Sequence, residues 1–131
     1  MCIRDIRKSL PEILAAFSAF AATHADAYLY LHTDMSGRLL GEGLDVLAIA
    51  EQFAPLGGRL LYTSPAEYER GWSRSEIADL YRAMDVLVAP SAGEGFGIPV
   101  IEAQACGIPV IVSNWATQAE LVGSGWGVGG Q

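Results

Sequence analysis

Cysteines, basic residues and long apolar runs are scarce in this sequence, and each shortage excludes a class of protein. The two cysteines, Cys2 and Cys106, are too few for a disulfide framework and have no neighbours with metal-ligand spacing. Such cysteine usage favours a reducing cytosol. The most apolar stretch, residues 13–22, is about half as long as a membrane-spanning helix. No signal peptide is visible at the start of the sequence, and we therefore expect a cytoplasmic protein.

Acidic residues outnumber basic ones, 15 against 8, and the net charge is −7. This balance argues against nucleic acids and anionic membranes as main partners, because both attract basic surfaces. It leaves room for a phosphate site, for which a few local cations suffice. The length of 131 residues suits one domain, and a composition of 51% hydrophobic and 18% charged residues indicates a globular fold.

Helix-like and strand-like segments alternate along the chain, which predicts an α/β fold with a parallel sheet. Capping boxes at residues 9–12 and 73–76 begin two of the helices. We expect a polar loop at residues 64–71 and a frayed, Gly-rich tail at residues 123–131. The predicted strands are residues 1–4, 27–32, 59–63, 85–90 and 109–112, and the predicted helices are residues 10–24, 44–53, 73–84, 98–106 and 117–122.

A polar cluster follows each predicted strand. In open parallel sheets, ligands bind beyond the carboxyl ends of the strands. We therefore expect the clusters to converge on one edge of the sheet. They comprise residues 4–8, 32–34, 64–65, 91–97 and 113–115.

The segment of residues 91–102 carries the most chemical information. It joins an apolar strand to a helix through a loop with three glycines, which let backbone N–H groups approach a ligand. The start of the helix adds unsatisfied donors and a partial positive charge, which suit a phosphate. Glu94 in the loop and Glu102 in the helix supply carboxylates, which accept hydrogen bonds from sugar or ribose hydroxyls. Phosphate donors beside hydroxyl acceptors indicate a nucleotide-sugar.

Residues 90–110 read Pro-Ser-x-x-Glu-Gly-Phe-Gly-Ile-Pro-x-x-Glu-Ala-x-Ala-Cys-Gly-x-Pro-Val. The pattern, which extends over residues 85–120, resembles the donor-site signature of retaining GT-B glycosyltransferases of family four, also described as glycosyl transferases group 1. The resemblance implies a Rossmann-like parallel sheet flanked by helices, one half of a GT-B enzyme. It further implies that residues 1–131 are a nucleotide-sugar (donor) binding domain, truncated at both ends and without the acceptor domain.

The resemblance also assigns roles to the matching residues. It places Glu94 on the donor sugar and Glu102 on the ribose hydroxyls. The basic residues before the first predicted helix resemble the segment that holds the donor diphosphate in this family, where cations offset the charge on the leaving phosphate. The catalytic candidates are thus Glu94, Lys8 and Arg4, and the substrate-binding candidates are Glu102, Gly95, Phe96, Gly97, Ile98, Arg7 and Ser91.

Several of these residues have a structural alternative. Residues 4–8 could be a solvated basic cluster, Glu102 an exposed helix residue, and Ser91 simply the end of a strand. Phe96 could equally be a core residue. For His32, which follows a predicted strand, a satisfied and partly buried histidine is preferred to a ligand-binding one.

By resemblance, the activity is that of a mannosyltransferase-like enzyme, which transfers a hexose from GDP-mannose to a glycan or lipid acceptor. The isolated chain is expected to be inactive, because the acceptor domain normally completes the site. No residue has the setting of a covalent nucleophile, which suits same-face transfer assisted by the leaving phosphate. The sequence has no Asp-x-Asp, and we expect neither a metal nor a cofactor.

Other functions remain open on the sequence alone. The chain could be a non-catalytic nucleotide-sugar binding fragment, a nucleotide-sugar epimerase of the same architecture, or an assembly domain with a vestigial site. Surfaces exposed by truncation could make the chain self-associate. The full-length enzyme could be peripheral to the membrane.

Overall fold

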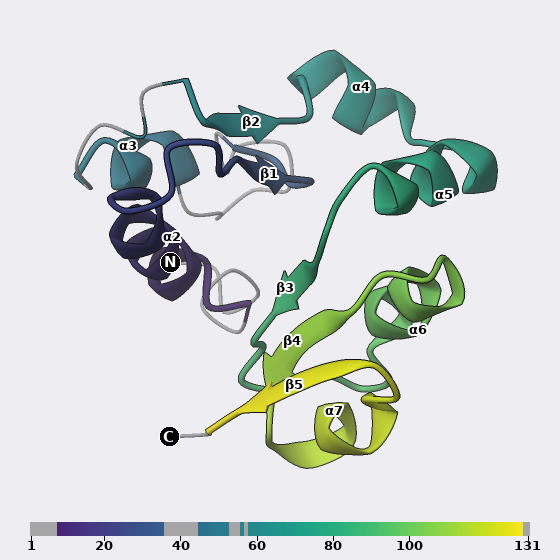
Figure 1. Ribbon diagram of the computed structural model, residues 1–131. Coiled ribbons are helices and arrows are strands. Elements are labelled where there is room, and N and C mark those ends of the chain that lie inside the picture. The colour runs from purple at the N-terminus through teal and green to yellow at the C-terminus, as the bar shows by residue number, and fades with distance from the viewer. Residues whose placement is uncertain (1–7, 36–44, 53–55, 57, 130–131) are drawn as a thin grey trace. The chain divides into compact units, whose positions relative to one another are not determined.

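The computed structural model describes residues 8–35, 45–52, 56 and 58–129. It divides into two compact units, Met1–Gly71 and Trp72–Gln131, each with its own parallel sheet and its own core (Figure 1). The first unit contains α2 (Leu10–Ala21), β1 (Leu29–Leu31), α3 (Val46–Ala50), β2 (Leu60–Tyr62) and α4 (Pro65–Arg70). The second contains α5 (Arg74–Arg82), β3 (Leu87–Ala89), α6 (Ile98–Ala105), β4 (Val110–Ser113), α7 (Ala116–Leu121) and β5 (Gly125–Val128).

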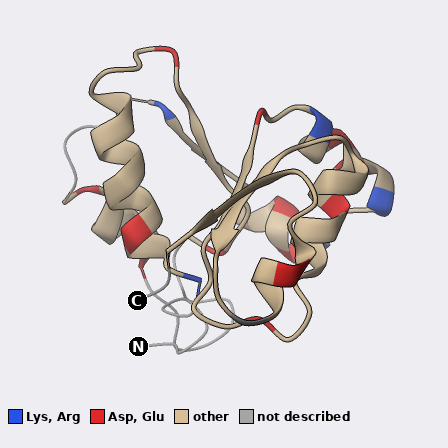
Figure 2. Cartoon of the chain, turned by 60° about the horizontal axis from the view of Figure 1, so that its bottom comes forward, with Lys and Arg blue, Asp and Glu red and all other residues tan. Residues whose placement is uncertain are grey.

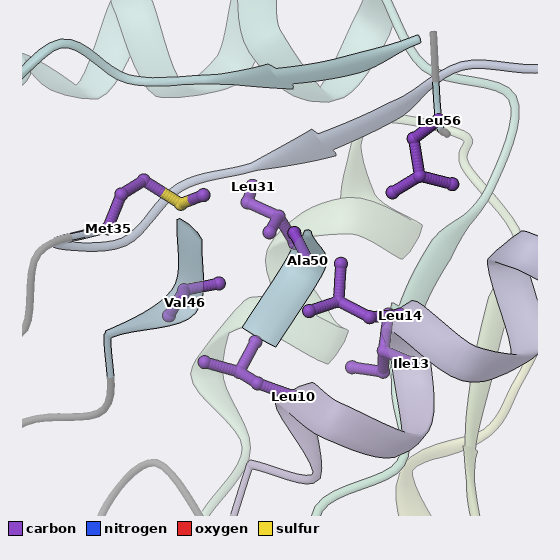
Figure 3. Packing of buried hydrophobic residues seen from close by; sticks show 8 residues of the cluster. All are labelled: Leu10, Ile13, Leu14, Leu31, Met35, Val46, Ala50 and Leu56. Carbon is purple, nitrogen blue, oxygen red and sulfur yellow. The ribbon is translucent and has the colours of Figure 1, made fainter. Parts of the chain in front are cut away.

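In the first unit, β1 and β2 pair in parallel, with Leu29 opposite Leu60. α2 packs against α3, and the spacing of its apolar residues gives it one buried face. The Arg59 guanidinium donates to the carbonyl oxygens of Ala21 and His24, at 2.9 and 3.0 Å, and so supplies donors to the end of α2. Figure 3 shows the resulting cluster of Leu10, Ile13, Leu14, Leu31, Met35, Val46, Ala50 and Leu56.

In the second unit, β4 lies between β3 and β5, and both pairings are parallel. α6 connects β3 to β4, and α7 connects β4 to β5 (Figure 1). One face of the sheet packs on these helices, and its core contains Tyr81, Val100, Ala103, Val110 and Val112. On the other face, Val88, Trp126 and Val128 are exposed in the described part of the chain. Parallel strands joined by helices confirm the predicted fold class, a Rossmann-like α/β fold.

Three helices show how local chemistry sets their starting points. Ser73 forms a capping box with Glu76, as its sequence predicts. The same device at Ser64 and Glu67 begins α4, so the prediction of a polar loop over residues 64–71 is wrong. Pro65 looks like a turn residue in the sequence, but proline is also favoured in the first turn of a helix. The capping box expected at Ser9 is wrong as well, because Ser9 has a left-handed backbone and its side chain makes no capping hydrogen bond.

The Gly-rich tail is the other correction to the predicted elements. Residues 125–128 form β5, which pairs with β4 along its whole length, where a frayed end was expected. Ser124 helps to begin this pairing, because its carbonyl oxygen accepts a hydrogen bond from the Val110 N–H at 3.0 Å. Glycine is unfavourable in most strands, which hides β5 in the sequence. The strand predicted at residues 1–4 lies outside the described residues.

The side chain of Gln104 fastens α6 to the segment between α7 and β5. Its amide nitrogen donates to the carbonyl oxygens of Val100 and Leu121, at 3.0 and 2.8 Å. Its amide oxygen accepts from the N–H groups of Gly123 and Ser124, at 2.7 and 2.8 Å. One side chain therefore satisfies a carbonyl at the end of α7 and two N–H groups in the turn that follows.

Acidic positions are spread over both units (Figure 2), in keeping with the net charge of −7. Along the described segments, none of the helices has both the length and the apolar character that crossing a membrane requires.

The backbone of Gly125 yields a stability prediction. Gly125 has a φ of +140°, and a Cβ there would overlap the backbone of Val110, whose nitrogen would be 2.6 Å away. Gly125→Ala should therefore lower the free energy of unfolding by about 2–4 kcal/mol, through backbone strain and overpacking. Urea denaturation measures the change.

Gly129→Ala is the matched control, because a Cβ at Gly129 would meet nothing within 4 Å. That variant should change the free energy of unfolding by less than about 0.5 kcal/mol. Equal effects of the two substitutions would contradict the β4–β5 pairing described above.

Candidate functional site

The candidate site lies at the carboxyl edge of the sheet in the second unit. Because β3, β4 and β5 are parallel, the segments that follow them leave from the same edge. Residues 91–97 follow β3, and Asn114 follows β4. The Asn114 N–H donates to the Val128 carbonyl oxygen at 2.7 Å, which continues the sheet to this edge. Two of the polar clusters named in the sequence therefore lie at the same edge of the sheet of the second unit.

The exit from β3 is fixed by hydrogen bonds to one carbonyl. The Ala89 oxygen accepts from the Ser91 N–H at 2.8 Å and from the Gln118 amide nitrogen at 2.9 Å. Ser91, which is 2% exposed, also donates its hydroxyl to the Gly93 carbonyl oxygen at 3.1 Å. Ser91 therefore shapes the first turn of the loop. Gln118 comes from α7, and no motif in the sequence indicates its role.

Gln118 also leaves an unpaired acceptor near this edge. Its side-chain oxygen is buried and has no hydrogen-bond partner among the described residues. Its amide nitrogen donates a hydrogen bond to the Ala89 carbonyl oxygen, which fixes the orientation of the amide and therefore the position of the unpaired oxygen. A buried acceptor of this kind costs stability unless a donor reaches it.

Glycine is required by the fold at one of the three loop positions, 97, and not at the other two. Gly97 precedes α6 with φ +75°, and a Cβ there would lie 3.0 Å from the Leu121 side chain, so the fold itself demands glycine. Around Gly93 and Gly95, a Cβ would meet nothing within 4 Å. Glycine at these two positions is therefore not required by packing, and the space beside them is open to a ligand.

Phe96 and Ile98 flank the start of α6 and are 59% and 57% exposed. The alternative interpretation of Phe96 as a core residue is therefore wrong. Gly97, the residue before the helix, has no side chain that could cap it. The positive end of the α6 dipole lies beside this exposed part of the loop.

Glu102 lies in α6 and points its carboxylate toward α5. Its Oε2 accepts a hydrogen bond from the Tyr81 hydroxyl at 3.2 Å. Tyr81 is 8% exposed, and burial raises its pKa above the usual value, with a further contribution from the charge of Glu102. Sequence reasoning missed Tyr81, although Ile77, Tyr81 and Met84 have the spacing of a packed helix face.

The remaining site candidates are Glu94 and the basic residues near the start of the chain, and the structure describes only some of them. Glu94 is partly buried in the loop. Lys8 is a described residue of the first unit, whereas Arg4 and Arg7 lie outside the described residues. The second unit thus holds together Ser91, Glu94, Gly95, Phe96, Gly97, Ile98 and Glu102.

The first unit has a separate polar cluster where β1 and β2 end. The hydroxyl of Thr63 is hydrogen-bonded with the Tyr30 hydroxyl at 2.7 Å and with Nδ1 of His32 at 2.8 Å. Burial lowers the pKa of His32. The preferred interpretation of His32 as a satisfied histidine is therefore confirmed. Over the described segments of both units, no group of three or more His, Cys, Asp or Glu residues could hold a metal ion.

Comparison with known proteins identifies the segment that carries this site. Residues 69–128 match the family described as "Glycosyl transferases group 1". A D-inositol 3-phosphate glycosyltransferase of Streptomyces bingchenggensis (strain BCW-1) is 45% identical over 68 residues, which are 52% of this chain and 15% of that protein. The O-antigen chain mannosyltransferase B of Escherichia coli is 42% identical over 60 residues, 40% of this chain and 16% of that protein.

A solved structure is similar in fold. It is described as the N-terminal domain of Candida albicans trehalose-6-phosphate phosphatase, and it matches with a TM-score of 0.60 at 15% identity over 86% of this chain and 26% of that one. The family match over residues 69–128 includes the whole loop, Glu102 and Tyr81. Residues 69–128 are therefore similar to the glycosyl transferases group 1 family, which is the resemblance that the signature at residues 90–110 predicts.

Proposed function

We propose that this chain binds the donor of a retaining glycosyltransferase, a nucleoside diphosphate sugar. The observation that carries the proposal is the loop of residues 91–97 at the carboxyl edge of the sheet, with α6 beginning at its end and Glu102 inside that helix. The chain spans 15% to 17% of the length of the first similar glycosyltransferases. Sugar transfer is accordingly proposed for the whole protein, of which this domain supplies the donor site.

The loop and α6 suit the phosphate part of such a donor. Backbone N–H groups at Gly95, Phe96, Gly97 and Ile98 could donate to phosphate and sugar oxygens, and the helix dipole favours negative charge there. Open space beside Gly93 and Gly95 would admit the ligand. Lys8, with Arg4 or Arg7, would hold the diphosphate and offset the charge that develops as it leaves.

The two carboxylates suit the hydroxyl-bearing parts. Glu102 would accept hydrogen bonds from the ribose diol, and Glu94 would orient the transferred sugar. The sugar proposed is a hexose, with mannose from GDP-mannose as the specific case, because one relative is named a mannosyltransferase. The acceptor would be a glycan or a lipid. Transfer with retention would proceed on one face of the sugar, assisted by the leaving phosphate.

Further parts of the proposal rest on sequence. The donor would be held without a metal ion, since the chain has no Asp-x-Asp. The location would be cytoplasmic. Self-association is supported by the exposed Val88, Trp126 and Val128 on one face of a sheet. Binding without transfer is the second candidate function for this chain alone, favoured by the small share of the related enzymes that it spans.

Donor binding is tested by isothermal titration calorimetry of the 131-residue chain with GDP, UDP and their sugars, in the presence of a chelator. We expect binding by at least one nucleoside diphosphate, and unchanged affinity when magnesium replaces the chelator. Absence of heat at millimolar concentrations of every ligand would overturn the proposed function. Binding only with added metal would overturn its metal-independent form.

The two carboxylates give a crossed prediction. Glu102→Gln should weaken binding of a nucleoside diphosphate about ten- to a hundredfold, because hydrogen bonds to a charged group contribute about 1.5–3 kcal/mol. Glu94→Gln should weaken the nucleotide-sugar and spare the bare nucleoside diphosphate. Glu120→Gln, the same change at an exposed position of α7, is the control and should alter neither affinity. Equal losses for both ligands in both site variants would contradict the separate roles.

A further inference from the structure

Tyr81 joins a buried ring to an exposed carboxylate. The ring belongs to the core of the second unit, together with Val100 and Ala103 of α6. The hydroxyl leaves that core and donates to Oε2 of Glu102 at 3.2 Å. α5 packs against α6, so the two side chains come from neighbouring helices. The hydrogen bond therefore links the orientation of the Glu102 carboxylate to the rigid core.

We propose that Tyr81 is a positioning residue, which holds the Glu102 carboxylate in the orientation that receives a ribose diol. The inference rests on the proposed function and adds to it a residue on a different helix. Tyr81 would act through Glu102 without contacting the nucleotide.

The acceptor capacity of a carboxylate supports this role. An ionised carboxylate has two oxygens with about four acceptor positions. Tyr81 uses one of these, on Oε2. The remaining positions are enough for two hydroxyl donors on adjacent ribose carbons. A free glutamate on a helix surface would sample several rotamers, and fixing a side chain of this kind on binding lowers the affinity about two- to tenfold.

Core packing alone does not explain the hydroxyl. A phenylalanine would fill the same space without bringing a polar group to the edge of the core, where an unpaired hydroxyl costs stability. At 3.2 Å, the hydrogen bond is longer than is usual for a hydroxyl and a carboxylate. A tyrosine hydroxyl is protonated at neutral pH at its usual pKa, and burial raises the pKa of Tyr81 further, so the hydroxyl is a donor.

The test compares wild-type chain, Tyr81→Phe, Glu102→Gln and the double variant by calorimetry with two ligands, GDP and its 2′,3′-dideoxy analogue. Tyr81→Phe should weaken GDP binding about two- to tenfold, as expected for losing a pre-oriented side chain. It should leave binding of the dideoxy analogue unchanged. The double variant should bind GDP no more weakly than Glu102→Gln, because Tyr81 acts only through that carboxylate.

Tyr28→Phe is the matched control, since Tyr28 is exposed and belongs to the first unit. It removes the same hydroxyl and should change neither affinity. Thermal unfolding of each variant separates a loss of structure from a loss of positioning. A second measurement uses the wild-type chain with 13C-labelled tyrosine. The Cζ signal of Tyr81, assigned with the Tyr81→Phe variant, should shift on binding GDP more than on binding the dideoxy analogue.

The outcomes discriminate between the two proposals. Tyr81→Phe that binds GDP as well as wild type does, while Glu102→Gln binds weakly, would overturn the positioning role and leave the proposed function standing. Equal weakening of both ligands by Tyr81→Phe, or equal Cζ shifts with both ligands in the wild type, would also overturn it. Absence of binding by the wild-type chain to any nucleoside diphosphate would overturn both proposals.

Discussion

The candidate site depends on the close packing of α6 against the sheet of the second unit. Val100 and Ala103 are the buried residues of this helix, at 1% and 0% exposure, and both belong to the core with Val110 and Val112. The small Ala103 side chain lets the helix approach the sheet closely. With those two positions turned inward, Glu102 is turned outward along the neighbouring edge of the helix. Packing thus decides which carboxylate is available for chemistry.

In the loop before α6, one glycine is needed for the fold, and two others leave space in which a ligand could bind. Gly97 satisfies the fold, because its backbone is left-handed and a side chain would meet Leu121. Gly93 and Gly95 satisfy no such requirement, yet glycine costs backbone entropy. Ser91 and Gln118 meanwhile fix the end of β3 through a shared carbonyl. The loop therefore begins at a hydrogen-bonded turn, ends at a closely packed glycine and has open space beside its middle residues.

The sequence allowed much of the second unit to be predicted, because its signals are local. The apolar strands and the capping box at Ser73 both depend on residues that are close together in the sequence. β5 could not be predicted, since its glycines are unfavourable in most strands and the strand is established by its pairing with β4. Tyr81 was missed for a related reason. Its importance arises from a neighbour 21 positions away, across two packed helices.

In the first unit, two predictions from sequence patterns are wrong, one at α4 and one at the start of α2. The sequence predicts a polar loop at residues 64–71, whereas Ser64 and Glu67 form a capping box that begins α4. Ser9 has the same spacing to Glu12 but a left-handed backbone, so the same pattern produced no cap. The residue spacing of a capping box is therefore not sufficient to form one, because the backbone of the first residue must also have the extended conformation. The site roles of Lys8, Arg4 and Arg7 were derived from resemblance and stay predictions.

The groups around Gln104 require an amide side chain at this position, and they require it in one orientation. Its nitrogen faces two carbonyl oxygens, and its oxygen faces two N–H groups. Turning the amide over would set like against like at all four contacts, so only one orientation is compatible with this surrounding. A carboxylate of the same shape could not donate a hydrogen bond to the two carbonyl oxygens. A hydrocarbon side chain could form none of the four hydrogen bonds. The junction of α6, α7 and β5 therefore depends on the polarity of the Gln104 side chain as much as on its size. Few other residue types at position 104 could form the same four hydrogen bonds.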